Sequence, residues 1–378
     1  MHTITGLNPH DEKPIEITVS DGIIQAINAS HRDEEQWLSS GFVDLQVNGY
    51  GGDDVNLDEP DPQAIFSLTE KMIALGVTTF LPTIITASEE KITAALRAVA
   101  RARQSSKLVA ECVPSVHIEG PHVSPLDGYR GAHPLEHVRP PDLAEFARWQ
   151  QASNRLVGMV TLSPHFEGAD EYISRLTAQG VHISIGHTHA SADQIHTAVD
   201  AGARLSTHLG NGMPSMIPRH PNPIWTQLSE DRLTATMIAD GQHLPGETIK
   251  AMLRAKGIGR SILVSDSVAL AGLPAGIYDA PVGGRVELHA NGRLSLAGTE
   301  YLAGAVLPLK DGIARAMTMA GISLSESIQM ATVNPGRFAG GVGVLEVGMA
   351  ADLVCFSIEV GGTGLRIERV LVKGKEWS

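Results

Sequence analysis

Between residues 42 and 264, short apolar runs alternate with longer amphipathic or alanine-rich runs, and this alternation restricts the possible folds most strongly. It predicts eight strands, at Phe42–Val47, Thr78–Ile84, Pro114–Ile118, Leu156–Leu162, His182–Ile185, Leu205–Thr207, Leu233–Ile238 and Ser261–Val264. Intervening helices are predicted at Pro62–Leu75, Ser88–Gln104, Asp142–Gln151, Asp170–Gln179, Ala192–Ala201 and Gly246–Ala255. Eight strand–helix units in series predict an α/β fold, a (β/α)₈ TIM-type barrel.

The two ends of the chain have a different pattern. Residues 1–40 and 340–378 contain short alternating strands around turn signals such as Ser20-Asp21-Gly22. We therefore expect both ends to pair into one small β-sandwich domain, with residues 41–339 forming the barrel. A further hairpin is predicted after the eighth strand, because Val286-Glu287-Leu288 is followed by Asn291-Gly292.

Composition excludes several classes of partner. A formal charge of −13 disfavours binding to nucleic acid or to an anionic membrane surface, since either needs a basic face. The sequence contains neither a long apolar run nor a signal-peptide pattern at its start, so a cytoplasmic location is predicted. Its two cysteines, Cys112 and Cys355, are far apart and lie in apolar surroundings, where we expect them to be buried.

Candidate metal ligands follow three of the predicted strands. Glu119, His187 and His208 come after the third, fifth and sixth strands, and barrel enzymes place their active sites at these carboxyl ends. One such residue alone would be an ordinary surface or core side chain. Three in units of the same kind indicate a shared site. Two histidines and a carboxylate, with one position open for water, are the ligand set of a catalytic zinc.

Asp266 follows the eighth predicted strand and would reach the same site. Beside a metal that activates water, it is the natural proton shuttle between that water and a leaving amine. The alternative is a helix N-cap in Ser265-Asp266-Ser267. Its place at a strand end favours the catalytic interpretation.

Several segments together resemble the amidohydrolase superfamily and, within it, the N-acetylglucosamine-6-phosphate deacetylases. They occur in the family's order: Gly41-Phe42-Val43-Asp44-Leu45-Gln46-Val47-Asn48-Gly49, His117-Ile118-Glu119-Gly120-Pro121, Gly186-His187-Thr188, Thr207-His208-Leu209-Gly210-Asn211-Gly212-Met213, Ala239-Asp240-Gly241-Gln242-His243 and Val264-Ser265-Asp266. The closing segment Gly343-Val344-Leu345, with Ala350-Ala351-Asp352-Leu353, also matches.

The resemblance implies a barrel with a β-sandwich built from both termini and the metal-dependent removal of acetate from N-acetylglucosamine 6-phosphate. Glu119, His187 and His208 resemble the metal ligands, and Asp266 resembles the general base and acid. His133 resembles the residue that helps polarise the acetyl carbonyl. Ala132 beside it would line the sugar site.

A phosphate subsite and a dimer are also implied by the resemblance. Asn211, Gly212, Arg219 and His243 match its phosphate and substrate contacts, and a guanidinium suits phosphate well. One such group comes from the neighbouring subunit in the family, which implies a homodimer. Residues Leu296-Ala297-Gly298 resemble the loop that closes over the substrate. Without the motif, Arg219 would be an exposed loop arginine.

The sequence departs from the superfamily pattern on its first strand. Gln46 and Asn48 replace the His-x-His that holds a second ion in many members, and an amide is a poor ligand for such a metal. We therefore expect one divalent ion per subunit, favouring Zn²⁺ over Fe²⁺, Co²⁺ or Mn²⁺, with Gln46 and Asn48 behind the ligands. His165 stands where the family shows Glu, and the loop after Arg219 also differs. Substrate preference is thus left open.

Other functions remain as alternatives. They include deacetylation of N-acetylgalactosamine 6-phosphate or of an unphosphorylated N-acetyl amino sugar, hydrolysis of N-acyl amino acids, and ring opening of a dihydropyrimidine-like substrate. A non-catalytic barrel that uses its metal for stability is another. His122, His189 and His220 lie near the predicted site in sequence; the sequence predicts solvated loop residues there, and no role is assigned to them.

Overall fold

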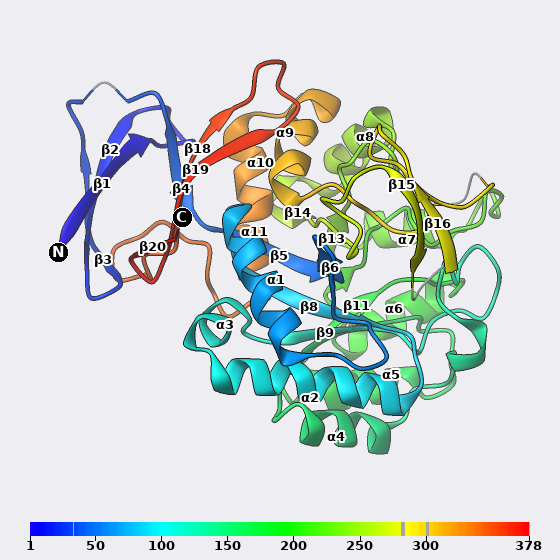
Figure 1. The fold of residues 1–378 in the computed structure, drawn as a ribbon. Coiled ribbons are helices and arrows are strands. Elements are labelled where there is room, and N and C mark those ends of the chain that lie inside the picture. The colour runs from blue at the N-terminus through cyan, green and yellow to red at the C-terminus, as the bar shows by residue number, and fades with distance from the viewer. Residues whose placement is uncertain (33, 281–283, 300–301, 378) are drawn as a thin grey trace.

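A parallel barrel sheet is the largest part of this computed structural model, which describes residues 1–32, 34–280, 284–299 and 302–377 (Figure 1). Its eight strands follow one another in chain order. They are β5 (Phe42–Val47), β8 (Val77–Ile85), β9 (Val116–Glu119), β10 (Val157–Leu162), β11 (His182–Ile185), β12 (Leu205–Ser206), β13 (Thr234–Met237) and β14 (Ser261–Leu263). The predicted barrel is confirmed. The third strand was placed too early, since Glu119 is its last residue.

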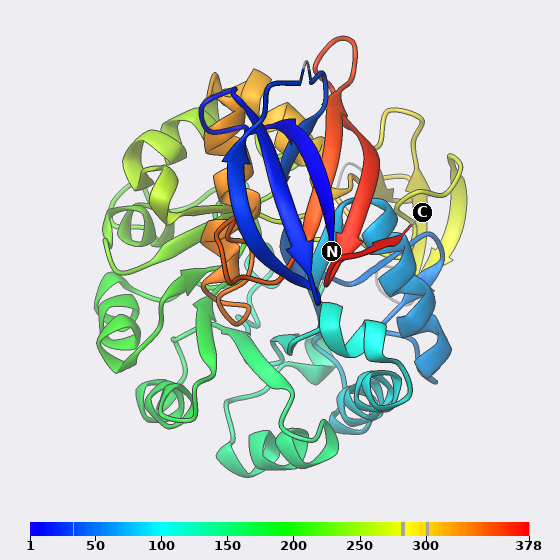
Figure 2. The same ribbon diagram turned by 90° about the vertical axis from the view of Figure 1, so that its left-hand side faces the viewer.

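Helices surround this sheet as a ring (Figure 2). Those predicted are α1 (Pro62–Ala74), α2 (Glu89–Ser105), α4 (Leu143–Ala152), α5 (Ala169–Thr177), α6 (Ala192–Ala201) and α8 (Gly246–Lys256). Several begin where a side chain caps the first turn, as Asp61, Ser88 and Ser191 do. Helices absent from the prediction are α3 (Lys107–Cys112), α7 (Pro223–Ser229), α9 (Leu309–Ala320), α10 (Leu324–Ala331) and α11 (Val333–Gly336).

The seam between the last and first barrel strands is closed by a side chain. The Asp44 carboxylate on β5 accepts the backbone N–H of Ser265, at 3.2 and 3.3 Å from its two oxygens. Beyond it, Val47 and Ser267 form an isolated parallel bridge. Burial raises the pKa of Asp44 to about 7, although these hydrogen bonds oppose the rise. The segment that carries Asp266 is thereby fastened to the strand that carries Gln46.

Both termini contribute to a second, separate sheet beside the barrel (Figure 1). Its order is β20 (Lys375–Trp377), β19 (Leu365–Val372), β18 (Leu353–Ile358), β4 (Trp37–Ser40), β1 (His2–Leu7), β2 (Pro14–Ser20) and β3 (Ile23–Ala29). Strand β4 joins the halves, since it pairs with β1 and with β18. One apolar cluster includes Ile17, Leu38 and Leu353 from both halves. The expected β domain from the two termini is confirmed.

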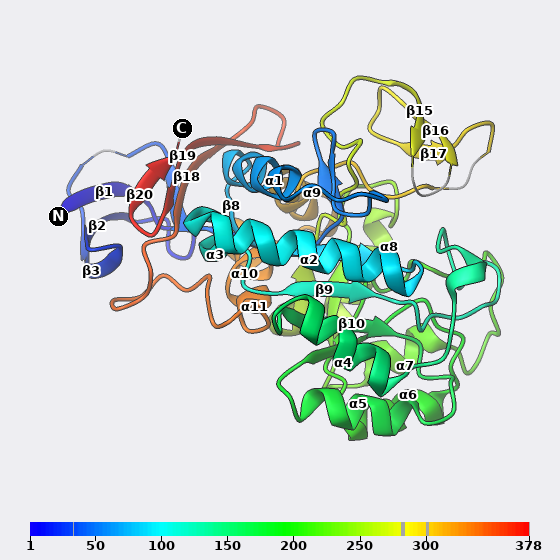
Figure 3. The same ribbon diagram turned by 60° about the horizontal axis from the view of Figure 1, so that its bottom comes forward.

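A small antiparallel sheet follows the last barrel strand. It contains β15 (Gly276–Ala280), β16 (Gly284–Leu288) and β17 (Leu294–Leu296), and it lies on the side of the barrel toward which the β9 arrow points (Figure 3). The hairpin predicted at Asn291-Gly292 joins β16 to β17. Another short pair, β6 (Gly49–Tyr50) and β7 (Asp53–Asp54), follows β5. Within the described ranges, no helix combines the length and apolar character needed to cross a bilayer.

Candidate active site

Three strand ends bring Glu119, His187 and His208 together. Glu119 Oε1 lies 2.9 Å from His208 Nε2 and 3.2 Å from His187 Nε2. The two imidazole nitrogens are 3.1 Å apart. All three side chains are buried, with at most 8% of each residue exposed. Three polar atoms thus converge on one point inside the barrel mouth.

The orientation of the His187 ring is fixed from behind. Its Nδ1 lies 3.0 Å from the carbonyl oxygen of Tyr129. A carbonyl only accepts, so Nδ1 donates its proton to Tyr129, and Nε2 faces Glu119 and His208. Gly212 packs against this ring, because a Cβ there would lie 2.6 Å from Nδ1. Metal-binding histidines are commonly held by such outer hydrogen bonds.

The charges in this cluster are strongly coupled. Burial would raise the pKa of Glu119, but hydrogen bonds from His187 and His208 hold it well below its usual range. Burial likewise opposes the charged form of His208, yet the hydrogen bond and charge of Glu119 raise its pKa. Behind the carboxylate, Gln46 Nε2 donates to Glu119 Oε2 at 3.1 Å. Glu119 is therefore kept ionised, as a metal ligand must be.

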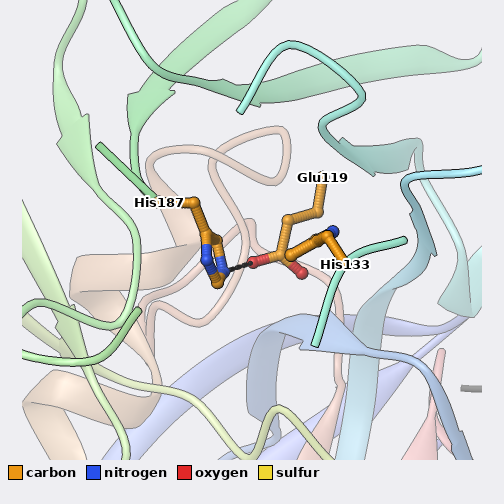
Figure 4. Close-up of side chains that lie close together, drawn as sticks. All are labelled: Glu119, His133 and His187. Carbon is orange, nitrogen blue, oxygen red and sulfur yellow. Dashed lines mark ion pairs between the residues drawn. The ribbon is translucent and has the colours of Figure 1, made fainter. Parts of the chain in front are cut away.

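His133 lies beside the same carboxylate (Figure 4). Glu119, His133 and His187 offer three ligand atoms that lie within 4.8 Å of one another. The His133 and His187 rings meet edge to face with centroids 4.2 Å apart. Burial, assisted by His187, lowers the pKa of His133 to about 3, so this ring is neutral. The buried Glu and His side chains thus form a group suited to a divalent metal.

Asp266 lies at the edge of this cluster and is held by Asn48, whose Nδ2 donates to Asp266 Oδ1 at 2.8 Å. Burial and the nearby charge of Glu119 raise the pKa of Asp266 to about 7. The charges of His208 and His243 and the bond from Asn48 oppose that rise. A carboxyl with this pKa can both take and give a proton near neutrality.

Backbone conformation also distinguishes these strand ends. His187, His208 and Asp266 have φ values of +47°, +27° and +49°, in the left-handed region that non-glycine residues rarely occupy. Such strain persists where the surrounding structure enforces it, and it clusters at functional sites. The three turns aim their side chains into the barrel mouth.

The predicted phosphate residues divide into two groups. Asn211 and Gly212 follow His208 directly, and Asn211 is tied to the His208 carbonyl by its backbone N–H at 2.9 Å. His243 Nδ1 lies 2.7 Å from the Asp240 carboxylate, and its side chain is only 10% exposed. Arg219, by contrast, is exposed. Within the described part of the chain, no hydrogen bond or ion pair involves its guanidinium.

Ala132 lies at a different opening. It lines a pocket of about 590 Å³ together with Thr86, Lys91 and His137. Thr86 Oγ1 is 2.8 Å from His133 Nδ1, so this pocket borders the group of candidate metal ligands around Glu119. Strand β17 ends at Leu296, and Ala297 and Gly298 follow it. Among the described residues, no backbone hydrogen bond connects these three to Glu119 or its partners.

The remaining histidines differ from one another. His122 is not solvated as predicted but fully buried, because its ring stacks on Trp149 and meets the edge of Tyr172. His165 and His189 lie with their ring centroids 4.3 Å apart, and their Nδ1 atoms contact Ser163 and Ser124 at 2.7 Å. His220 is exposed, as predicted.

Sequence reasoning missed four groups that hold the site. Tyr129 acts through its carbonyl, so no side-chain pattern could have identified it. Thr86 contacts His133 by a hydrogen bond. Asp240 contacts His243 and Asp44 contacts Ser265 in the same way. Asp240 had a usable signal: an aspartate three residues before a histidine, here with its Oδ1 accepting the backbone N–H of His243 at 2.8 Å.

Residues 37–377 match the Amidohydrolase family, and the chain belongs to that family. The barrel, the terminal sheet and the Glu/His/His cluster are those of a metal-dependent hydrolase. Among curated proteins, it is 32% identical to the N-acetylglucosamine-6-phosphate deacetylase of Bacillus subtilis, over 90% of this chain and 88% of that protein. It is 31% identical to the N-acetylgalactosamine-6-phosphate deacetylase of Escherichia coli, over 95% and 94%.

Solved structures show the same likeness. A mutant N-acetyl-D-glucosamine-6-phosphate deacetylase from Mycobacterium smegmatis, in complex with N-acetyl-D-glucosamine-6-phosphate, superposes with a TM-score of 0.86. The identity is 28%, and the match covers 98% of this chain and 97% of that one. The corresponding enzyme from Thermotoga maritima gives a TM-score of 0.86 at 25% identity, with 99% of each chain covered.

Proposed function

We propose that this protein is a metal-dependent deacetylase that removes acetate from N-acetylglucosamine 6-phosphate and yields glucosamine 6-phosphate. The observation that carries the proposal is the convergence of Glu119 and two histidine nitrogens within 3.2 Å, beside an aspartate whose pKa is about 7. The named relatives and the ligand-bound Mycobacterium smegmatis structure support the substrate class.

The ligand set in this proposal is Glu119, His187 and His208, and the ion is one Zn²⁺ per subunit, with Fe²⁺, Co²⁺ or Mn²⁺ as substitutes. When bound, such an ion supplies Lewis acidity and an activated water at neutral pH. Gln46 and Asn48 support a single ion, because their amide groups already donate to Glu119 and Asp266. Neither offers the imidazole that a second ion would need.

Asp266 performs the proton transfers. As a carboxylate it takes a proton from the attacking water, and it later gives that proton to the amide nitrogen as the C–N bond breaks. Asn48 holds one of its oxygens in place throughout. A pKa near the working pH allows one group to serve first as base and then as acid.

His133 orients and polarises the acetyl carbonyl. This role requires the ring proton on Nε2, with the Thr86 hydroxyl donating to Nδ1 at 2.8 Å instead of to the Glu119 carbonyl oxygen at 3.4 Å. Ala132, next to it, lines the sugar pocket. Leu296, Ala297 and Gly298 close over the sugar from the small antiparallel sheet.

The phosphate is bound by Asn211, Gly212 and His243, and by Arg219 from a neighbouring subunit. Arg219 is exposed, and no described residue bonds to its guanidinium, while the other three lie near His208 and Asp266 within one chain. This division supports a homodimer. We also propose a cytoplasmic location, since a charged sugar phosphate does not cross a bilayer unaided and must meet its enzyme where it is made.

Acetate release by the zinc-loaded protein tests this function. The substrates are N-acetylglucosamine 6-phosphate, its galactosamine epimer and unphosphorylated N-acetylglucosamine. The epimer is included because relatives named for each sugar are similarly close, at 32% and 31% identity. The proposal expects the highest kcat/KM for the first. Faster turnover of the epimer would move the assignment to that sugar, and no acetate from any substrate would refute it.

A further inference from the structure

Four buried polar side chains form a hydrogen-bonded chain inside the barrel, named here the hydroxyl chain: His117, Thr161, Thr207 and Ser184. His117 Nε2 lies 2.7 Å from Thr161 Oγ1, which lies 2.7 Å from Thr207 Oγ1. Thr207 Oγ1 is 2.5 Å from Ser184 Oγ. None of the four is more than 4% exposed. Barrel interiors are usually filled by branched apolar residues, so this interior calls for an explanation.

Two bonds of the hydroxyl chain cross the barrel interior between strands that are not neighbours. At one end, His117 on β9 reaches the carbonyl oxygen of Leu45 on β5 at 3.1 Å, past the intervening β8. In the middle, Thr161 on β10 meets Thr207, which follows β12, across the intervening β11. The backbone ladder cannot join these strands, so side chains tie them together.

The donor and the acceptor of every hydrogen bond in the hydroxyl chain are determined. Leu45 offers only a carbonyl acceptor, so the neutral His117 ring donates from Nδ1 and accepts at Nε2. Thr161 must then donate to His117, Thr207 to Thr161 and Ser184 to Thr207. A chain with one proton order holds one set of side-chain positions.

The members of the hydroxyl chain sit close in sequence to the residues proposed to bind the metal. His117 precedes Glu119 by two positions, and Thr207 comes immediately before His208. Ser184 precedes His187 by three positions, with Gly186 between them. A Cβ at Gly186 would lie 2.8 Å from Thr161 Cγ2 and from Thr207 Cβ. The hydroxyl chain therefore packs against the segment that turns His187 into the site.

We propose that the hydroxyl chain is a positioning device that sets the spacing of the three strand ends carrying Glu119, His187 and His208, and so sets metal affinity. This inference rests on the ligand set of the proposed function. Thr161 is its central positioning residue: without its hydroxyl, His117 loses a donor and Thr207 loses an acceptor. Ser184 is terminal, and its loss leaves the other three bonds intact.

Zinc affinity, measured by competition with a chelator in the absence of substrate, tests the proposal. Thr161→Val keeps the shape and removes the hydroxyl, so its Kd should rise about tenfold, at the low end for a lost outer-shell partner. Thr161→Ser keeps the hydroxyl and should stay within about twofold of the wild type. Thr69→Val is the matched control, because Thr69 is equally buried and donates to Ile65 on α1, away from the site.

Ser184→Ala keeps the proposal falsifiable if Thr161→Val does not fold. Its Kd should rise by about threefold, less than for Thr161→Val, because only the terminal donor is lost. Wild-type affinity in a folded Ser184→Ala or Thr161→Val protein would overturn the proposal, as would an equal loss in Thr69→Val. Missing deacetylase activity would refute the proposed function instead, since this zinc measurement uses no substrate.

Discussion

The two ends of the candidate substrate site are built differently. At the metal end, Gln46 donates to Glu119, Asn48 donates to Asp266, and the Tyr129 carbonyl accepts from His187, all within one chain. His208 contacts Glu119 directly. At the phosphate end, His243 is braced by Asp240, but Arg219 is exposed and the contacts of the described residues leave its guanidinium without a partner.

This contrast separates the chemistry from substrate selection. Reacting groups must be placed before the substrate arrives, because ordering them later costs free energy at the barrier. A phosphate-binding arginine can be ordered by the charge it binds, or supplied by another subunit. Changes at the metal end should therefore lower kcat, whereas changes at the phosphate end should raise KM.

Metal removal should give the largest effect. Stripping the protein with a chelator is expected to abolish acetate release, because the ion held by Glu119, His187 and His208 supplies the activated water. Added Zn²⁺ should restore the activity. Circular dichroism should show that the barrel stays folded. Full activity in protein that elemental analysis finds free of metal would contradict the proposal that catalysis needs a bound metal ion.

Asp266→Asn should come next. The amide still offers an oxygen to Asn48, so fold and zinc content should persist, but no base remains to take the proton. We expect kcat to fall by about a thousandfold, within the range for a lost general base. Steady-state kinetics with zinc quantified in the same sample would check this. A kcat within tenfold of the wild type would end the proposed role of Asp266.

Arg219→Ala should act on the other end. Losing a charged hydrogen bond of about 2 kcal/mol should raise KM for the 6-phosphate about thirtyfold, with kcat largely kept. Turnover of unphosphorylated N-acetylglucosamine should not change. Arg254→Ala, another exposed arginine, is the control. Equal losses with both substrates would remove Arg219 from the phosphate subsite.

The smallest effect concerns pH. Asp266 must be ionised to act as a base, and burial raises its pKa to about 7, so kcat/KM should fall about tenfold per pH unit below the midpoint. A bound cation favours the carboxylate, which places the midpoint of the loaded enzyme below 7. Asn48→Ala removes a bond that stabilises the charged form and should move the midpoint upward. An unchanged midpoint would show that Asn48 does not act on Asp266.

The metal end could be predicted from sequence because its information is local. Ligands that follow strands need only the strand count to be placed together, and the eight-unit alternation supplied that count. Tyr129, which contributes a carbonyl, and the hydroxyl chain could not be predicted, since threonine and serine in strands look like ordinary strand formers. The position of the Arg219 guanidinium could not be predicted, because an exposed loop side chain is not fixed by the packing of the barrel.

The central claim is one ion held by Glu119, His187 and His208, with Asp266 ready to act on the N-acetyl group beside it. Crystals of the zinc-loaded Asp266→Asn protein, soaked with N-acetylglucosamine 6-phosphate, would test it by anomalous diffraction at the zinc edge. The account predicts a single zinc peak between those three side chains and an intact N-acetyl group next to position 266. A second peak of equal height by Gln46 and Asn48, or no peak among the three ligands, would contradict it.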